Sequence, residues 1–488
     1  MKSNTNESLP RGWSMAKLGD VLPLSYGKSL VEEKRDSSGT VPVFGSSGLV
    51  GHHSSALVDK PTLIIGRKGN VGAVFHSEVP CWVIDTAYFV ANFASVYLSF
   101  FRYLIAFLQL GRLDRSTAVP GLSRNDYNEL IVPVPPENEQ RRIVAEIEKQ
   151  FTRLDAAVAA LKRIQANLKR YRAAVLKAAC EGRLVPTEAE LARREGRSYE
   201  PASVLLERIL ADRRSRWEAV QNNGKKSNYK DPRSLELSIL PSLSEGWEWA
   251  SLGSIAELKG GLTKGQKRKP TDKVREVPYL RVANVQRGYL DLNEIKTIDA
   301  TPGEIDELRL VDGDVLFNEG GDRDKLGRGW VWEGKIHECV HQNHVFRARL
   351  APDTIQPKFL SWYGNSMGRR YLEDEGKQTT NLASLNMTKL SMLPVPIPPV
   401  AEQKRIVSEL ERRLSVIDEM EAEVNADMRR SERLRQGILK HAFEGKLAPQ
   451  DSKDDPASSL LERIHAEQPT KPITLQKKNR RLEVAHGH

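Results

Sequence analysis

The sequence is poor in cysteine and lacks any long apolar run. Its 488 residues include three cysteines, Cys81, Cys180 and Cys339, which lie far apart and suggest no disulfide framework. No apolar stretch approaches the roughly 20 residues that span a bilayer. The polar N-terminus, MKSNTNESLPRGW, lacks the apolar core of a signal peptide. These features predict a cytoplasmic protein.

Motifs for nucleotide binding and catalysis are also missing. GGLTKGQKRK and GRKGNVG are rich in glycine, but their spacing differs from that of a phosphate-binding loop and neither ends in Lys-Ser or Lys-Thr. The sequence contains no Gly-x-Ser-x-Gly nucleophile elbow and no Asn/Asp-Pro-Pro-aromatic element of an amino-methyltransferase. We therefore expect neither a catalytic site nor a cofactor in this chain.

Two polar segments have the composition of metal sites. HECVHQNH (337–344) offers imidazole and thiol groups, which are usual zinc ligands, but its alternation fits a strand and no second ligand pair follows at a conventional spacing. The carboxylates of 314–324 alternate with basic residues, which favours a solvated turn. We expect no metal site at either segment.

The net charge of +10 suggests an anionic partner, but the charge is unevenly spread. Residues 1–136 contain 13 basic and 11 acidic side chains, and residues 243–399 contain 22 of each. Any surface that binds nucleic acid must therefore arise because the fold separates the charges.

The most regular part of the sequence is a heptad stripe that occurs twice. In the first copy, which begins at Glu137, apolar residues recur every seven positions without a helix breaker, as in a coiled coil. Proline-rich segments precede both copies, and glycines Gly182 and Gly445 end them. The predicted seam consists of Ile147, Leu154, Leu161, Leu168 and Val175 in the first helix, and Leu410, Ile417, Val424 and Ile438 in the second.

A helix of about 45 residues would be roughly 65–70 Å long and needs a partner to cover its apolar stripe. We expect the two helices to pair with each other, although each could instead pack separately on a globular core. Asp427 and Ser431 stand where Ile164 and Leu168 stand in the first copy, which makes the expected seam imperfect there.

The repeat includes a domain before each helix. LPRGWSMAKLGDVLPL near the N-terminus is matched by LSEGWEWASLGSIAEL from residue 243, and each domain then alternates short strands with Gly- and Asn-rich turns. We predict an α+β fold of two domains with mostly antiparallel strands, separated by two long antiparallel helices. The predicted segments are 1–136, 137–186, 187–242, 243–399, 400–449 and 450–488.

Polar loops in both domains offer groups that suit a DNA groove. Arg and Lys bind phosphates or guanine edges, and Asn and Gln pair with adenine edges. For any one residue, ordinary solvent exposure remains an alternative. The candidates are Arg67, Lys68, Asn70, Arg112, Arg115, Ser116 and Thr117 in the first domain, and Arg323, Lys325, Arg328, Gln342, Asn343, His344, Lys377, Gln378, Thr379 and Thr380 in the second.

Taken together, these repeats resemble the specificity subunit of type I restriction–modification enzymes. The resemblance rests on the paired GW…LG openings, on the P-P-x-x-E-Q-x-R-I-V entries to the helices and on the EG-[RK]-L-x-P exits. It covers nearly the whole chain. It implies two α/β target recognition domains related by a pseudo-twofold repeat, each of which reads one half of a bipartite, asymmetric DNA site.

The resemblance also implies partners. The helices would set the spacer between the half-sites and dock two modification subunits, which methylate adenine with S-adenosylmethionine. Restriction subunits would supply translocation and cleavage with ATP and Mg. This chain would itself be non-catalytic and would bind double-stranded DNA without contacting a membrane. The alternative is a related bipartite-site system with a fused or separate nuclease.

Overall fold

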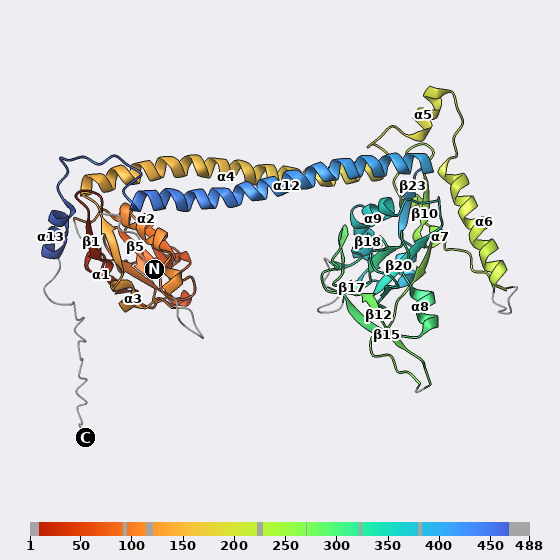
Figure 1. The fold of residues 1–488 in the computed structure, drawn as a ribbon, viewed down its shortest axis with the longest axis horizontal. Helices are drawn as coiled ribbons and strands as arrows, with labels where there is room; N and C mark the ends of the chain where they lie inside the picture. Colours follow the sequence, from red (N-terminus) through yellow and green to blue (C-terminus); the bar gives the residue numbers. More distant parts are fainter. Residues whose placement is uncertain are drawn as a thin grey trace, which may run out of the picture. The chain divides into compact units, whose positions relative to one another are not determined.

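The described chain forms two units of mixed helix and strand. The computed structural model describes residues 9–90, 95–113, 121–221, 228–269, 271–321, 325–378 and 383–467. The contacts between residues divide the chain into two compact units. Unit 1 consists of Met1–Lys162 and Asn425–His488, and unit 2 consists of Arg163–Val424. Each unit contains one α+β domain and parts of two long helices, α4 (Glu137–Cys180) and α12 (Val400–Phe443) (Figure 1).

The first domain is built around a four-stranded antiparallel sheet. Its order is β2 (Leu24–Tyr26), β8 (Ala87–Val90), β5 (Thr62–Gly66) and β6 (Val74–Ser77). A second sheet has the order β4 (Gly48–His53), β3 (Val41–Gly45) and β7 (Trp82–Val83). An antiparallel pair of β1 (Ser14–Lys17) and β9 (Ile131–Val134) connects the start of the domain to the entry of α4.

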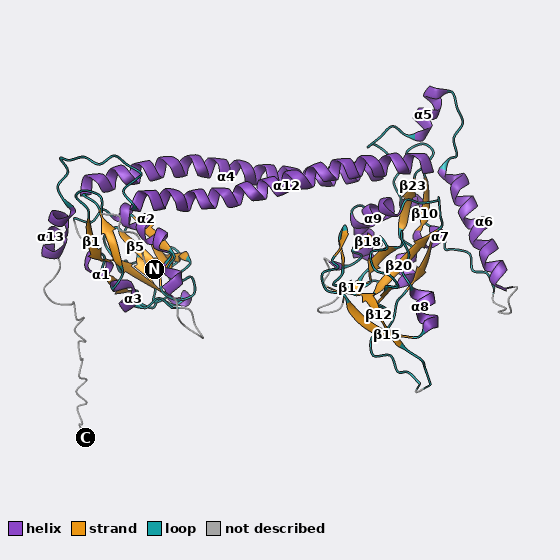
Figure 2. Ribbon diagram, viewed as in Figure 1, coloured by secondary structure: helices purple, strands orange, loops and turns teal. Residues whose placement is uncertain are grey.

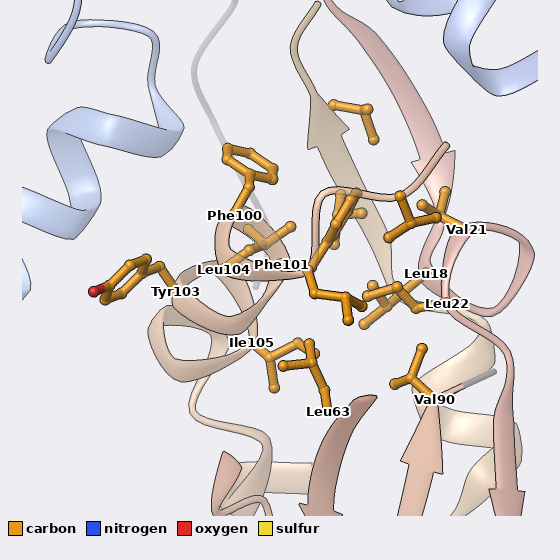
Figure 3. Packing of buried hydrophobic residues seen from close by; sticks show 14 of the residues in the cluster. Leu18, Val21, Leu22, Leu63, Val90, Phe100, Phe101, Tyr103, Leu104 and Ile105 are labelled. Carbon is orange, nitrogen blue, oxygen red and sulfur yellow. The ribbon is translucent and has the colours of Figure 1, made fainter. Parts of the chain in front are cut away.

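Helix α2 (Leu98–Leu108) covers this sheet and completes the core of the first domain. Its residues Phe101, Leu104 and Ile105 pack with Leu63 of β5 and Val90 of β8 (Figure 3). All five residues of β5 are buried, so the continuous apolar run TLIIG forms a central strand. Two shorter helices lie next to the β1–β9 pair in sequence: α1 (Leu18–Val21) follows β1, and α3 (Arg124–Asn128) precedes β9.

The second domain repeats this plan with longer connections (Figure 2). Its four-stranded sheet has the order β11 (Ala256–Lys259), β20 (Val345–Leu350), β16 (Val315–Asn318) and β18 (Gly329–Val331). A second sheet contains β15 (Lys296–Ala300), β12 (Arg275–Leu280) and β19 (Val340–His341). The pair β10 (Glu248–Ser251) and β23 (Pro394–Ile397) leads into α12.

The remaining elements of this domain occupy its connections. They include α7 (Leu252–Ile255), β13 (Val285–Gln286), β14 (Tyr289–Leu290), α8 (Pro302–Leu308), α9 (Pro357–Asn365), α10 (Gly368–Glu375) and α11 (Met387–Ser391). The predicted antiparallel character is confirmed for most strand pairs. Two pairs are parallel, β3 with β7 and β12 with β19, and each is joined by the crossover connection that parallel strands require, which agrees with the prediction of mostly antiparallel strands.

The two long helices are antiparallel in both units. In unit 1, Asp155 forms an ion pair with Arg435, and Arg142 lies 2.5 Å from Asp454. Residues earlier in α4 therefore contact residues later in the chain, as antiparallel pairing requires. Unit 2 shows the same order, since Arg172 pairs with Asp418 and Glu421 while Glu188, further along the chain, pairs with Arg405. Each helix contains 44 residues and begins where the prolines end. The predicted pairing is therefore confirmed.

Most of the predicted seam is covered by protein. Ile147, Leu168, Val175, Leu410, Ile417 and Val424 are buried, and Leu154, Leu161 and Ile438 are half-buried. Ser431 is buried as well, so a small polar residue occupies the seam as the heptad alignment predicts. The expectation for Ile164 is wrong, since 44% of its surface is exposed and it lies outside the seam.

Short segments after each long helix return to the domain of the same unit. Helix α6 (Ala202–Gln221) begins with Ala202, whose amide donates to the Gly246 carbonyl at 2.8 Å. Helix α13 (Ala457–Glu467) begins with Ala457, whose amide donates to the Gly12 carbonyl at 2.8 Å. Helix α5 (Glu188–Glu195) precedes α6. The three cysteines are free and buried, and no described helix is long and apolar enough to cross a membrane.

Candidate nucleic-acid interface

In the first domain, Arg67 and Lys68 directly follow β5 and lie beside the turn before β8. Both main-chain amides donate to the Thr86 carbonyl, at 2.9 and 3.1 Å. The Arg67 Nε also donates to the Asp85 carbonyl at 3.0 Å. The backbone and the side chain of Arg67 are therefore both held at this edge of the sheet.

An aromatic pair lies against the Arg67 guanidinium. Its carbon atom is 5.5 Å from the ring centroid of Tyr26 and 5.9 Å from that of Tyr88, distances typical of cation–π contacts. Arg124 approaches Tyr26 at 5.9 Å. Burial raises the pKa of Tyr88, so this ring stays neutral at physiological pH. Sequence reasoning missed Tyr26 and Arg124 because both lie far from Arg67 along the chain.

Asn70 and Arg112 join this cluster through a close approach of two backbones. Gly72 has a φ of 77°, and a Cβ on it would lie 2.6 Å from the Gly111 amide nitrogen, so only glycine fits. This packing places the exposed Arg112 beside the turn that carries Asn70. The structure thus brings together all predicted residues of the first domain that it describes.

In the second domain, Glu319 directly follows β16 and pairs with His344. The Glu319 amide donates to the His344 carbonyl at 2.9 Å, and the two side chains meet at 2.6 Å between Oε2 and Nδ1. The Leu385 amide donates to the Glu319 carbonyl at 2.7 Å. His344 exposes 54% of its side chain. The sequence assigned Glu319 to a solvated turn and did not place it among the DNA contacts.

The neighbouring turn residues are fixed by their backbone bonds. The amides of Gln342 and Asn343 donate to carbonyls of Leu280 and Leu262, at 2.9 and 2.8 Å. Arg328 lies in the connection from β16 to β18, and its carbonyl accepts a hydrogen bond from the amide of Asn318, the last residue of β16. These predicted residues therefore surround the carboxyl end of β16.

Other predicted residues reach the same edge through a small sheet. The strands β17 (Gly320–Gly321) and β21 (Lys377–Gln378) both pair with β22 (Ala383–Ser384), so Lys377 and Gln378 lie near the end of β16. The Lys325 carbonyl accepts from the Arg328 amide at 3.3 Å. The remaining candidates, Arg115, Ser116, Thr117, Arg323, Thr379 and Thr380, lie outside the described residues.

Three of the groups considered as metal ligands, His341, Cys339 and Asp314, are buried in the core. His341 is buried with its Nδ1 2.6 Å from the Val345 carbonyl, and burial lowers its pKa to about 4. Burial raises the pKa of the Cys339 thiol to about 12, and Asp314 pairs with Arg349 at 2.8 Å. In the described part of the chain, no three His, Cys, Asp or Glu side chains are placed to hold a metal.

Each domain therefore presents hydrogen-bonding side chains on rigid turns at one edge of its main sheet. The arrangement suits recognition of a polar ligand. Cations and amides at such an edge can contact phosphates and base edges.

Comparison with known protein families identifies the family of this chain. The family described as "Type I restriction modification DNA specificity domain" matches residues 10–170 and again 244–427, which together make up most of the chain. The chain belongs to this specificity family. The two matches correspond to the two domain-and-helix repeats, and the resemblance seen in the sequence is confirmed.

Other members of the family align with nearly the whole chain. The EcoKI specificity subunit of Escherichia coli (strain K12) is 26% identical over 92% of this chain and 89% of its own length. The EcoDI specificity subunit of Escherichia coli is 24% identical over 94% of this chain and 96% of its own length.

A solved structure from a study of assembly and conformational transition in the type I R-M system shares the fold. Its TM-score is 0.55 at 18% identity, over 90% of this chain and all of that chain. The specificity family therefore explains the duplicated architecture.

Proposed function

We propose that this chain is the DNA-specificity subunit of a type I restriction–modification enzyme. Each domain reads one half of a bipartite, asymmetric site on double-stranded DNA. The chain itself is non-catalytic, and it acts in the cytoplasm, where the DNA lies.

The observation that carries this proposal is that the two edges lie at the same position of the fold but differ in their chemistry. Both domains expose the turn after the third strand of the main sheet, β5 or β16, against the turn before β8 or β20. Directly after the third strand, the first edge presents Arg67, whereas the second presents Glu319 paired with His344. Such a pair suits two unlike half-sites, since base edges differ in their donors and acceptors.

The catalytic steps belong to partner subunits in this proposal. Two modification subunits dock on the paired helices and transfer a methyl group from S-adenosylmethionine to adenine. Restriction subunits use ATP and Mg to move along DNA and cut it. The paired helices determine the length of the gap between the half-sites.

Mapping of methylated adenines in a host that carries this chain and its partners tests the proposal. We expect modification only within one split motif with a fixed gap. Methylation without a gapped motif would reject the proposal. A system with a fused or separate nuclease would instead give cleavage of DNA by the purified chain with Mg²⁺, or cleavage by a partner that lacks ATP dependence.

Replacement of one domain provides a sharper version of this test. A chain in which residues 13–136 come from another member of the family should recognise a new first half-site with the second half and the gap unchanged. The physical reason is that the first edge lies wholly within that segment. Replacement of residues 247–399 is the matched control and should change only the other half. A change in both halves after either exchange would contradict separate reading.

A further inference from the structure

One backbone position is equivalent in the two domains but carries opposite charge. It is occupied by Arg67 in the first domain and by Glu319 in the second. In each case the main-chain amide donates a hydrogen bond of 2.9 Å to a carbonyl in the turn before the neighbouring strand of the sheet, β8 or β20. The main-chain carbonyl accepts a hydrogen bond from a leucine amide, at 2.9 or 2.7 Å. These partners are Thr86 and Leu122 for Arg67, and His344 and Leu385 for Glu319.

The neighbouring backbone confirms this equivalence. The residue before this position also bonds in the same way in both domains. The Gly66 amide donates to the Ala73 carbonyl, and the Asn318 amide donates to the Arg328 carbonyl, both at 2.8 Å. After this position, Lys68 bridges to Gly121, as Gly320 pairs with Ser384. The two side chains therefore leave the same point of the same scaffold.

The surroundings hold the Arg67 guanidinium in one orientation. Its Nε bonds the Asp85 carbonyl, and the rings of Tyr26 and Tyr88 lie within 6 Å. The guanidinium also forms a hydrogen bond with the Tyr88 side chain, and its remaining terminal N–H groups stay in the guanidinium plane as a fork of donors. Such a fork matches the O6 and N7 acceptors of guanine in the major groove.

Glu319 is held in a comparable way but presents acceptors. One carboxylate oxygen contacts His344 Nδ1 at 2.6 Å, and its backbone is bonded on both sides. The other oxygen can accept a hydrogen bond from an exocyclic amino group, which cytosine N4 and adenine N6 carry in the major groove.

We propose that this shared position reads one base in each half-site, with Arg67 selecting a guanine and Glu319 selecting an amino-bearing base. The inference rests on the proposed function and adds the residue and the base chemistry that distinguish the halves. The charge reversal at one backbone position explains how one scaffold recognises two unlike sequences.

The test uses the assembled methyltransferase, with the chain and its modification subunits, and DNA carrying the mapped motif. Arg67→Ala should reduce discrimination at one G·C pair of the first half-site by roughly ten- to hundredfold. All other positions should keep their preference. Replacing that guanine with 7-deazaguanine, which lacks N7, should weaken binding by the unaltered chain and have little further effect on Arg67→Ala.

The corresponding experiment on Glu319→Ala uses bases that lack the amino group. Pyrimidin-2-one in place of cytosine, or purine in place of adenine, should weaken binding by the unaltered chain at one position of the second half-site. The substitution that loses its effect in Glu319→Ala identifies which of the two bases is read.

Two matched variants control for general damage. Arg35→Ala removes an arginine whose Nη1 bonds the Val50 carbonyl at 2.9 Å in the same domain, and Glu338→Ala removes a carboxylate that pairs with Arg275 at 2.8 Å. Both should leave the motif unchanged.

Three outcomes would overturn the inference. The mapped motif could stay fully specific in both alanine variants. Relaxation after Arg67→Ala could fall on an A·T pair. Binding could weaken equally for all sequences with a smaller salt dependence, which marks phosphate contacts. Failure of the unaltered chain to produce a split motif would instead reject the proposed function.

Discussion

At the residue scale, an ion pair connects the segment that follows each long helix to the N-terminal end of the other long helix. Arg142 of α4 lies 2.5 Å from Asp454, which exposes only 7% of its side chain. Arg405 occupies the equivalent place on α12 and lies 2.7 Å from the buried Glu188. Both arginines also donate to a proline carbonyl, of Pro449 and of Pro186. The repeat thus extends to individual contacts.

Asp454→Asn should loosen α13 from the first domain. The change removes the charge that pairs with Arg142 in a poorly exposed site, and hydrogen bonds between charged groups contribute about 1.5–3 kcal/mol. We expect faster hydrogen exchange of the amides in 457–467, measured by mass spectrometry. Asp455→Asn is the control, because Asp455 is exposed. Equal exchange in both variants would refute a role for the pair.

The same contact should respond to acid. The hydrogen bond from Arg142 lowers the pKa of Asp454 below its ordinary 3.8, so the folded state favours the charged form. The stabilisation is present above pH 3.8 and is lost as the pH falls through the lower folded value. The protection factors of the amides in 457–467, which correct the measured exchange for its intrinsic pH dependence, should therefore fall below about pH 4 in the unaltered chain. Asp454→Asn should show a smaller change over this window.

At the scale of elements, each long helix ends at a glycine that packs against a tryptophan. Gly182 and Gly445 have φ values of 67° and 69°, in the left-handed region that ends helices. A Cβ on either would approach the ring of Trp247 or Trp13, at 3.1 and 3.3 Å. The glycines therefore stop the helix and also bring its end against the domain of the same unit.

One glycine inside α12 and one just after its end should respond in opposite ways to alanine. At Gly437, inside the helix, a Cβ would meet nothing within 4 Å, so Gly437→Ala should stabilise the protein by about 0.5–1 kcal/mol. Gly445→Ala should destabilise it by about 1 kcal/mol or more, because its φ is positive and its Cβ would press on Pro10. Thermal unfolding measures both. A similar shift for the two variants would contradict these roles.

At the scale of the whole molecule, the proposed function gives the paired helices the role of setting the length of the DNA gap. Their length follows from the heptads, and their antiparallel order is visible separately in each unit. In the proposed function, a shorter pair of helices can serve only a shorter gap between the half-sites.

Deletion of one heptad from each helix tests this relation. Removal of 158–164 and 426–432 keeps the stripes in phase and shortens each helix by about 10 Å, at 1.5 Å per residue. Since a base pair rises about 3.4 Å, we expect a gap shorter by about three base pairs with both half-sites unchanged. Methylation mapping reads the gap. An unchanged gap would contradict the ruler function, and deletion from one helix alone should disrupt the pairing.

Much of the architecture could be predicted because it depends on patterns along the chain. The heptads predicted the bounds and the pairing of α4 and α12, and the repeated GW…LG segments predicted two equivalent domains. The candidates Arg67, Lys68, Asn70 and Arg112 came from glycine-rich turns, and the structure places them together at one edge.

The sequence alone therefore determined the repeat, the long helices and the glycine-rich turns, because heptad spacing, capping and turn chemistry act between near neighbours. Only the tertiary structure decided that Tyr26 and Arg124 lie beside Arg67, that Glu319 meets His344, and that Ile164 faces solvent. Strand pairing brings these groups together across long stretches of chain. No local pattern records such distances, because they are set by packing of the whole sheet.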